Sequence, residues 1–135
     1  MNTLATLAKS PEPRLFPATI LQTQFTVLPK SATMTGDMAA SEDLGIRLDG
    51  EYTGKIELGK AGSIHIAGGA TVTTELIIAD YIYVEGTVNG KLHARKGMEL
   101  SPTAKVKGSI QYDADLDMHP GARISGQING PETNL

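Results

Sequence analysis

The side chains best suited to chemistry are three histidines, His65, His93 and His119, in a chain that has no cysteine. A histidine can serve as a general base or as a metal ligand, but metal ligands must converge within about 2.1 Å of one ion. The three fall in different units of an internal repeat, and the apolar residues beside His65 and His93 point both rings outward. We therefore predict solvated surface histidines, with no catalytic residue, no metal site and no enzymatic activity.

A second candidate is the alternating acidic run Asp113, Asp115 and Asp117. An EF-hand calcium loop needs a glycine at its sixth position and a glutamate at its twelfth, but Met118 and Ile124 stand there. The calcium motif is therefore not matched. We interpret the run as a solvated strand face that discourages lateral aggregation.

Phosphate-binding and nucleic-acid-binding signals are weak. Neither Gly68-Gly69 nor the Gly59-x-x-Gly62 pattern is followed by Lys-Ser/Thr or by a predicted helix, so we expect no nucleotide and no cofactor. A basic cluster could form an electrostatic contact surface, but it is a local patch on an acidic body, and we expect no nucleic-acid partner. Its members are Lys91, Arg95, Lys96, Lys105 and Lys107.

Composition separates a tail from a body. The chain has 135 residues, 12 basic against 15 acidic side chains, 15 glycines and no tryptophan. No apolar stretch approaches the ~20 residues that span a bilayer. Residues 1–33 contain four of the seven prolines and a net charge of +2, whereas residues 34–135 have a net charge of −5. We predict a flexible or extended proline-containing tail over 1–33, a β-rich body over 34–130 and a short C-terminal tail over 131–135.

The body is an internal repeat with a unit of 16 to 20 residues. Each unit contains the pattern apolar-x-Gly-x-apolar, except that Thr74 replaces glycine in one unit. A unit this short with strand periodicity cannot bury its apolar side chains alone, so the units must stack into a β-solenoid of about six coils, each with three short sides. The first apolar residues of the six patterns are Met34, Tyr52, Val72, Val88, Val106 and Ile124.

The glycine column of this repeat stands between two inward-pointing apolar residues on the same side of the strand. We expect these glycines to point inward as well, where only a hydrogen atom fits beside the turning backbone. At Thr74, which breaks the column, we expect a slightly widened coil. The glycines are Gly36, Gly54, Gly90, Gly108 and Gly126.

These units resemble the bactofilin family of bacterial cytoskeletal proteins. The resemblance rests on the segments Thr35-Gly36-Asp37-Met38, Glu42-Asp43-Leu44 and Leu48-Asp49-Gly50-Glu51-Tyr52-Thr53-Gly54-Lys55-Ile56, followed by serial V-x-G-x-[IL] units, and it covers about residues 34–130. It implies an all-β chain with a single right-handed, triangular β-helix that polymerises end to end into nonpolar filaments without nucleotide. It also implies a cytoplasmic scaffold at the inner face of the membrane that positions cell-wall enzymes or other morphogenetic partners.

The chief rival is the left-handed hexapeptide solenoid of acyltransferases, or a non-catalytic relative of it. From Val88 onward every sixth residue is apolar or nearly so, as that fold requires. However, the hexapeptide rule also wants a small residue four positions later, and Leu92, Met98 and Ile110 stand at such positions. The coils of 20 and 16 residues also break the six-residue phase, so we favour the right-handed solenoid. A transferase should be a discrete trimer, whereas the cytoskeletal protein should sediment as filaments.

The two ends of the solenoid are the predicted polymerisation interface. Residues 131–135 are too few to cap the last coil, so its strand edges and the side chains of Ile124 and Ile128 should be open to a second copy of the chain. Met34 and Met38 occupy the corresponding place in the first coil. We expect like ends to dock in a self-complementary contact.

The tail is the predicted membrane or partner contact. It carries apolar side chains that the body does not need, namely Leu4, Leu7, Leu15 and Phe16. An alternative is that the segment 20–28 folds back over an end or a flank of the β-helix.

Overall fold

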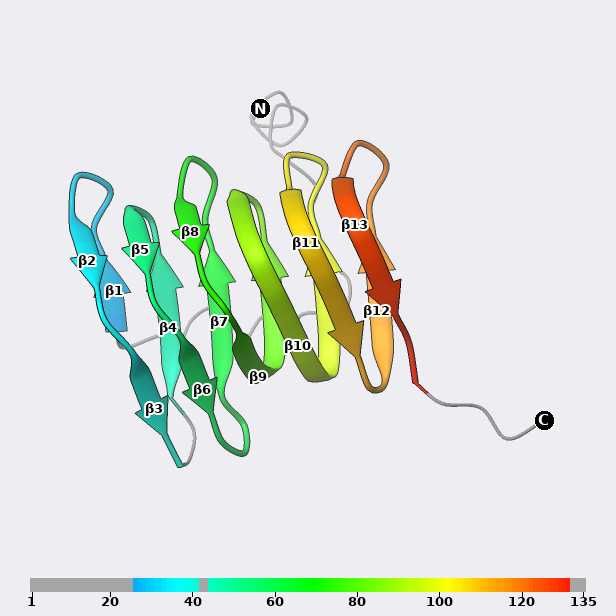
Figure 1. The fold of residues 1–135 in the computed structure, drawn as a ribbon, viewed down its shortest axis with the longest axis horizontal. Coiled ribbons are helices and arrows are strands. Elements are labelled where there is room, and N and C mark those ends of the chain that lie inside the picture. Colours follow the sequence, from blue (N-terminus) through cyan, green and yellow to red (C-terminus); the bar gives the residue numbers. More distant parts are fainter. Residues whose placement is uncertain (1–25, 42–43, 132–135) are drawn as a thin grey trace, which may run out of the picture.

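The computed structural model describes residues 26–41 and 44–131, which form an all-β solenoid with 13 strands (Figure 1). Within these ranges no helix is long and apolar enough to cross a membrane. The strands are β1 (Thr26–Leu28), β2 (Thr33–Thr35), β3 (Met38–Ala40), β4 (Gly45–Leu48), β5 (Glu51–Thr53), β6 (Ile56–Leu58), β7 (Ser63–Ile66), β8 (Thr71–Thr73), β9 (Ile77–Val84), β10 (Thr87–Leu100), β11 (Lys105–Tyr112), β12 (Asp115–Met118) and β13 (Arg123–Asn129).

The strands wind into about six coils with three faces, and all the strand pairs between neighbouring coils are parallel. Face A contains β1, β4, β7, the second half of β9, the end of β10 and β12. Face B contains β2, β5, β8 and the first parts of β10, β11 and β13. Face C contains β3, β6, the start of β9, the middle of β10 and the ends of β11 and β13.

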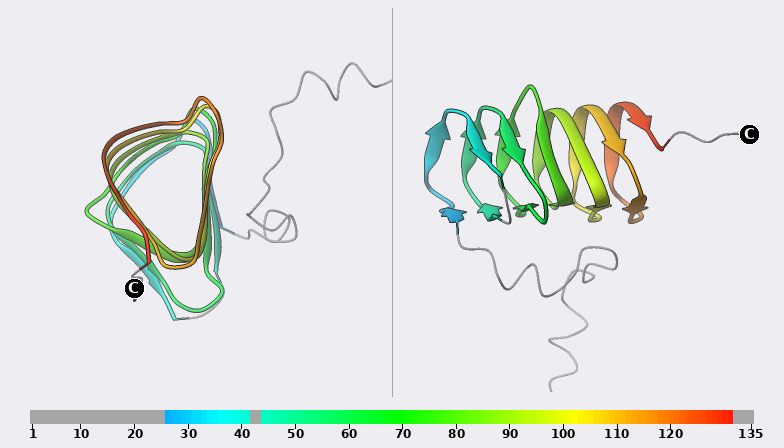
Figure 2. Two further views of the ribbon diagram at one scale, coloured as in Figure 1. Left: turned by 90° about the vertical axis from the view of Figure 1, so that its right-hand side faces the viewer. Right: turned by 90° about the horizontal axis from the view of Figure 1, so that it is seen from below.

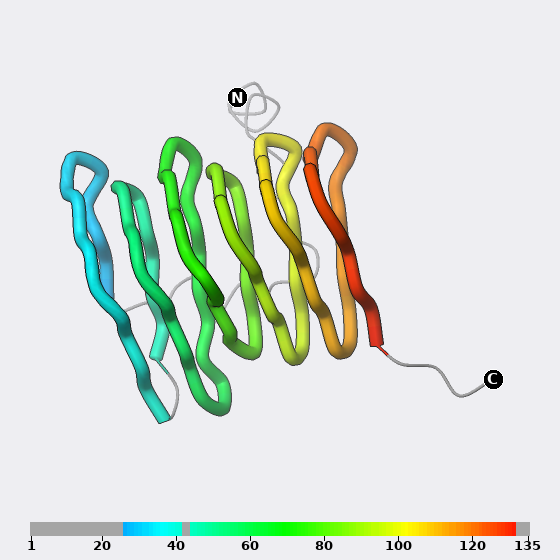
Figure 3. Tube along the Cα trace, in the orientation of Figure 1, coloured from blue at the N-terminus to red at the C-terminus, as the bar shows by residue number. Residues whose placement is uncertain are grey.

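The solenoid is right-handed and triangular in section, as the bactofilin resemblance implies. In Figure 1 the coils advance from left to right, the nearer strands run downward and the farther strands run upward, which defines a right-handed winding. Figure 2 (left) shows the three sides of the section, and Figure 3 shows the continuous path of the backbone. This handedness rules out the left-handed hexapeptide fold that the sequence left open as the rival.

The core is a set of apolar columns inside the tube. Equivalent residues of successive coils lie in register, so that Ile46, Ile64, Ile82 and Met98 stack along face A, all fully buried. Burying one such side chain contributes roughly 1.5–3 kcal/mol relative to leaving it exposed. Because each coil shares its core with its neighbours, the coils stabilise one another.

The glycine column does not point into the core, and in this respect the sequence expectation was wrong. Gly108 and Gly126 have φ angles of 135° and 147°, a region that residues with a Cβ rarely adopt. A Cβ on Gly108 would collide with the carbonyl oxygen of Gly90 in the preceding coil, and one on Gly126 would collide with that of Gly108. The empty sides of Gly54, Gly90, Gly108 and Gly126 therefore face the preceding coil, where the backbones stack at the bend between faces B and C.

The coil at Thr74 contains one extra residue. Asn89 is in register with Thr73 and Leu92 with Ile77, so residues 74–76 lie opposite only residues 90–91. The hydroxyl oxygen of Thr74 accepts a hydrogen bond from the backbone N–H of Leu76 at 3.1 Å, which stabilises the longer path. The widening expected at Thr74 thus takes the form of a one-residue insertion.

The described β-helix begins earlier than the sequence suggested. Strand β1 lies inside the segment 1–33 that was expected to be tail, and it pairs in register with β4. Leu28 is buried in the core. Pro29 follows β1 directly and its carbonyl accepts a hydrogen bond from Ala32, so the proline lies in a turn where its missing N–H breaks no strand ladder.

Candidate assembly surfaces and polar clusters

Both ends of the solenoid present open strand edges among residues 26–41 and 44–131. Strands β1, β2 and β3 pair only with the second coil, and the end strands β12 and β13 pair only with β10 and β11. Open strand edges of this kind can continue a sheet with another chain. The ends are therefore the natural surfaces for self-association.

Large exposed apolar side chains gather in the same two coils. In the described part of the chain they are Val27 and Met34 in the first coil and Met118 and Ile128 in the last, with exposed fractions of 40–51 %. In the inner coils such positions are covered, as for Ile110, which is the register partner of Ile128 and fully buried. Met34, Met118 and Ile128 lack only the next coil that would bury them, whereas Val27 points outward from face A beside Arg47.

The four predicted interface residues lie at the two ends of the solenoid, two at each end. Met34 and Met38 lie in the first coil, and Ile124 and Ile128 lie in the last. Met34 and Ile128 are exposed, whereas Met38 and Ile124 are half-buried against the core. Their role in polymerisation stays a prediction.

Two exposed end residues were missed. Val27 was assigned to the tail, because Pro29 suggested a chain break, but it lies on the outer surface of face A beside Arg47. Met118 is 40 % exposed, although its column partner Leu100 is fully buried. The signal that could have identified Met118 is its place as the last member of that column. The predicted tail residues Leu4, Leu7, Leu15 and Phe16 lie outside the described residues.

Each histidine contacts a carboxylate of a neighbouring coil, and the prediction of solvated histidines was wrong for two of them. His65 and His119 are 6 % and 3 % exposed. Each of these two histidines is 20 residues away in sequence from the glutamate that it contacts. This spacing differs from the period of the repeat, so no motif revealed the pairs. The pairs, each between a histidine Nε2 and a carboxylate oxygen, are His65–Glu85 at 2.6 Å, His93–Asp113 at 2.8 Å and His119–Glu99 at 2.5 Å.

The most buried polar cluster has the residue types of a metal site. One ligand atom each from Glu99, Asp117 and His119 lies within 4.8 Å of the others, and Nε2 of His119 is 3.7 Å from Asp117 Oδ2. The direct contact between His119 and Glu99 already gives both buried groups a polar partner without an ion. We therefore interpret the cluster as a polar cross-link between the last two coils.

Arg95 and Asp80 form a clamp across three coils on the outer side of the solenoid. Arg95 Nε donates to Asp80 Oδ1 at 2.8 Å, and Arg95 Nη2 donates to the carbonyl oxygens of Leu58 and Gly59. The other oxygen of Asp80 accepts a hydrogen bond from the backbone N–H of Ala61 at 2.8 Å. Ala61 has a positive φ of 64°, so the carboxylate also holds a left-handed turn in place.

The clamp determines the charge state of Asp80. Burial by itself would raise the pKa of this carboxyl group, but the hydrogen bonds from Arg95 and Ala61 and the charges of Arg95 and Lys96 outweigh it and lower the pKa below its ordinary value. Arg95 and Lys96 are thus partly neutralised by Asp80. Two of the five members of the predicted basic cluster therefore have an acidic partner.

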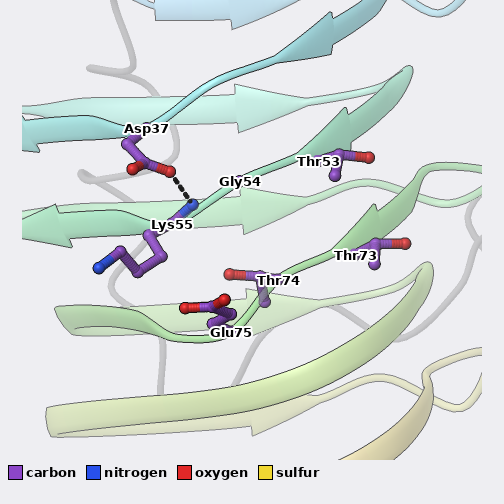
Figure 4. A pocket seen from close by; sticks show the side chains of 7 residues that line it. All are labelled: Asp37, Thr53, Gly54, Lys55, Thr73, Thr74 and Glu75. Carbon is purple, nitrogen blue, oxygen red and sulfur yellow. Dashed lines mark hydrogen bonds between the residues drawn. The ribbon is translucent and has the colours of Figure 1, made fainter.

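A shallow groove lies on the outer surface where the first three coils bend (Figure 4). The backbone N–H of Lys55 donates to Asp37 Oδ1 across it at 2.9 Å. None of the residues that line it is a histidine. Its lining residues are Asp37, Thr53, Gly54, Lys55, Thr73, Thr74 and Glu75.

Beside this groove Tyr52 joins the first two coils from within. Its ring is buried in the core, and its hydroxyl donates to the carbonyl oxygens of Gly36 and Lys55. Burial, and then the nearby charge of Asp37, raise the pKa of the phenol, which therefore stays protonated as a donor.

Comparison with known proteins agrees with this architecture. A family profile described as "Bactofilin: Polymer-forming cytoskeletal" matches residues 26–129. The cryo-EM structure of Thermus thermophilus bactofilin double helical filaments is similar, with 28% sequence identity, a TM-score of 0.69, and coverage of 78% of this chain and 99% of that one. No curated protein matches the chain. Because the family profile spans most of the sequence and the fold agrees with that of a solved filament subunit, this chain belongs to the bactofilin family of polymer-forming cytoskeletal proteins.

Proposed function

We propose that this chain polymerises end to end into nonpolar filaments without nucleotide, and that the filaments position cell-envelope or morphogenetic partners. The observation that supports end-to-end assembly is the coincidence of open strand edges with large exposed apolar side chains at both ends. The open edges supply directional hydrogen bonds, and the apolar side chains supply burial.

Docking of like ends follows from the chemistry of the last coil. A two-fold axis perpendicular to the solenoid brings Ile128 of one copy close to the same residue of the other, and it lets the two β13 edges pair with opposite strand directions. Such a contact is closed and self-complementary. A second contact of the same kind between first coils, around Met34, extends the filament and leaves it without polarity.

The experiment uses one charged substitution at each end. Ile128→Arg and Met34→Arg each place a guanidinium in one proposed contact, and Thr71→Arg adds the same charge at an exposed outward position of face B. Sedimentation and electron microscopy of nucleotide-free protein measure assembly, and circular dichroism confirms folding. We expect Thr71→Arg to form filaments and the two end variants to form none.

The size of the end variants tests the nonpolar arrangement. In a nonpolar filament one like-to-like contact survives in each variant, so each should form a dimer by itself. In a head-to-tail filament the two variants should be monomers that dimerise only when they are mixed. Long filaments from a folded Ile128→Arg protein would show that the interface has been assigned to the wrong place.

The proposed location is the cytoplasm, at the inner face of the cytoplasmic membrane. The support is the pair of apolar side chains Leu4 and Leu7 near Lys9, which would insert beside anionic lipid headgroups. Deleting residues 2–10 should release the protein from membranes in a fractionation assay and leave filament formation intact. Unchanged membrane association would contradict this part of the proposal.

A further inference from the structure

Positive charge gathers on one face of the last two coils. Lys105, Lys107 and Arg123 point outward from face B and are exposed; we call these three the basic patch. Among residues 26–41 and 44–131, none of the three is in an ion pair. A shallow groove of about 220 Å³ lies between them. The equivalent outward positions of the first four coils hold no basic residue; they are Thr33, Thr35, Glu51, Thr53, Thr71, Thr73, Thr87 and Asn89.

Negative charge gathers in the same part of the solenoid on a different face. Asp113 lies at the bend before β12, and Asp115 and Asp117 point outward from β12 on face A; we call these three the acidic strip. The imidazoles of His93 and His119, which contact the strip, supply at most two positive charges against its three carboxylates. These five side chains together therefore keep a net negative charge in every protonation state of the histidines.

We propose that two copies of the chain dock side by side, with the basic patch of one against the acidic strip of the other. Residues two apart on a strand are separated by about 6.6 Å, so Lys105 and Lys107 have the same spacing as Asp115 and Asp117. Both pairs lie in the last two coils, so parallel copies offset by no more than one coil bring them opposite each other. The inference concerns the sides of the solenoid and goes beyond the proposed end-to-end contact.

Charge also determines which faces can meet. A contact between two basic patches, or between two acidic strips, brings like charges together and is unfavourable. Because the two patches lie on different faces, each copy in a basic-to-acidic contact keeps one patch open to a third copy. Such a contact is heterologous and continues from copy to copy. Neighbouring filaments should therefore associate into open bundles or ribbons, and not into closed pairs.

The contact should be weak between two single subunits and strong between two filaments. Ion pairs between exposed side chains each contribute little, but a filament repeats the same two patches along its length, so the contacts reinforce one another once the first has formed. Salt screens such charges, because the Debye length is about 10 Å at ~0.1 M salt and about 3 Å at ~1 M. Bundles should therefore form at low salt and separate into single filaments at high salt.

The direct test reverses the charge of each patch in the full chain. One variant carries Lys105→Glu with Lys107→Glu, and the other carries Asp113→Lys with Asp115→Lys; circular dichroism checks that both fold. Low-speed sedimentation collects bundles, high-speed sedimentation also collects single filaments, and electron microscopy identifies the two. At about 0.05 M salt, where screening is weak, we expect the low-speed pellet to fall at least about fivefold in each variant. Mixing preformed filaments of the two variants should restore the pellet, because the reversed patches complement each other.

The matched control is Lys30→Glu with Lys60→Glu, which reverses two exposed lysines of the first two coils and should bundle like the natural chain. Bundling that persists in both patch variants, or a mixture that does not recover, would overturn the proposal. The high-speed pellet should be the same in every variant, since end-to-end assembly uses other surfaces. A natural chain that forms no filaments contradicts the proposed function instead. The lateral contact is then measured as salt-sensitive association of subunits in sedimentation velocity, and its absence would overturn the inference.

Discussion

The clamp between Asp80 and Arg95 makes a measurable prediction about stability. In the variant Asp80→Asn the side chain keeps its shape but loses its charge, and its amide group cannot accept from both Arg95 and Ala61 as the carboxylate does. The change therefore weakens the connection across three coils and the left-handed turn at Ala61 together. No core residue is altered.

The magnitude follows from burial. A hydrogen bond to a charged group contributes about 1.5–3 kcal/mol. The side chain of Asp80 is only 4% exposed, but that of Arg95 is 31% exposed and is partly screened by water. We therefore expect the free energy of unfolding to fall by about 2 kcal/mol, which lowers Tm by roughly 8 °C in a domain of this size.

The matched control is Asp113→Asn. Asp113 also contacts a side chain of a neighbouring coil, since its Oδ2 is 2.8 Å from Nε2 of His93. The side chain of Asp113 is 43% exposed, so we expect the free energy of unfolding to fall by less than about 0.5 kcal/mol. Thermal unfolding followed by circular dichroism at one protein concentration keeps the contribution of assembly comparable. If Asp80→Asn loses no more stability than Asp113→Asn, the clamp does not stabilise the fold.

Three further predictions follow from the same coils. Because the folded-state pKa of Asp80 is lowered from 3.8, the stability advantage of the natural chain over Asp80→Asn should be complete above about pH 4 and should disappear as pH falls through the folded pKa; urea midpoints across this range check it. Gly108→Ala should cost at least about 3 kcal/mol or prevent folding, since its Cβ meets backbone at a positive φ, whereas Gly68→Ala, with open space around its Cβ, should be nearly neutral in thermal unfolding. Tyr52→Phe should lower the free energy of unfolding by about 1 kcal/mol in denaturant titrations, because the hydrogen bond from the buried ring to the Gly36 carbonyl is lost; an unchanged midpoint would show that this hydrogen bond contributes nothing.

The repeat predicted the stacking of the coils because equivalent positions of successive repeat units pair with one another. Val88, Val106 and Ile124 were expected to form one column, and the structure pairs them in register. The all-β class, the approximate number of coils and the family were confirmed on the same pattern. Strands in which every second residue is apolar, repeated in units of similar length, leave few other ways to bury the apolar side chains.

The sequence was less informative where the outcome depends on the neighbouring coil. The direction of Gly108 depends on a backbone angle that residue type does not reveal, since glycine adopts both signs of φ. His65 contacts Glu85 and the ring of Tyr83, both in the next coil, and neither residue belongs to a local motif with it. The strand at Val27 was not predicted because a proline usually interrupts a strand, whereas Pro29 lies in the turn that follows it.

The constant register of the coils also shapes how the chain can fold. Residues that pair between coils are separated by a similar, short distance along the chain, 18 positions for Val88 and Val106 and 16 for Val72 and Val88. Closing loops of this length costs little more for the last coil than for the second, because no strand pairing among residues 26–41 and 44–131 joins distant parts of the sequence. Once one coil has formed, each later one can add to the edge it leaves, in the order in which the ribosome releases the chain. At every stage the growing protein presents the same kind of edge that the finished subunit presents to its neighbour.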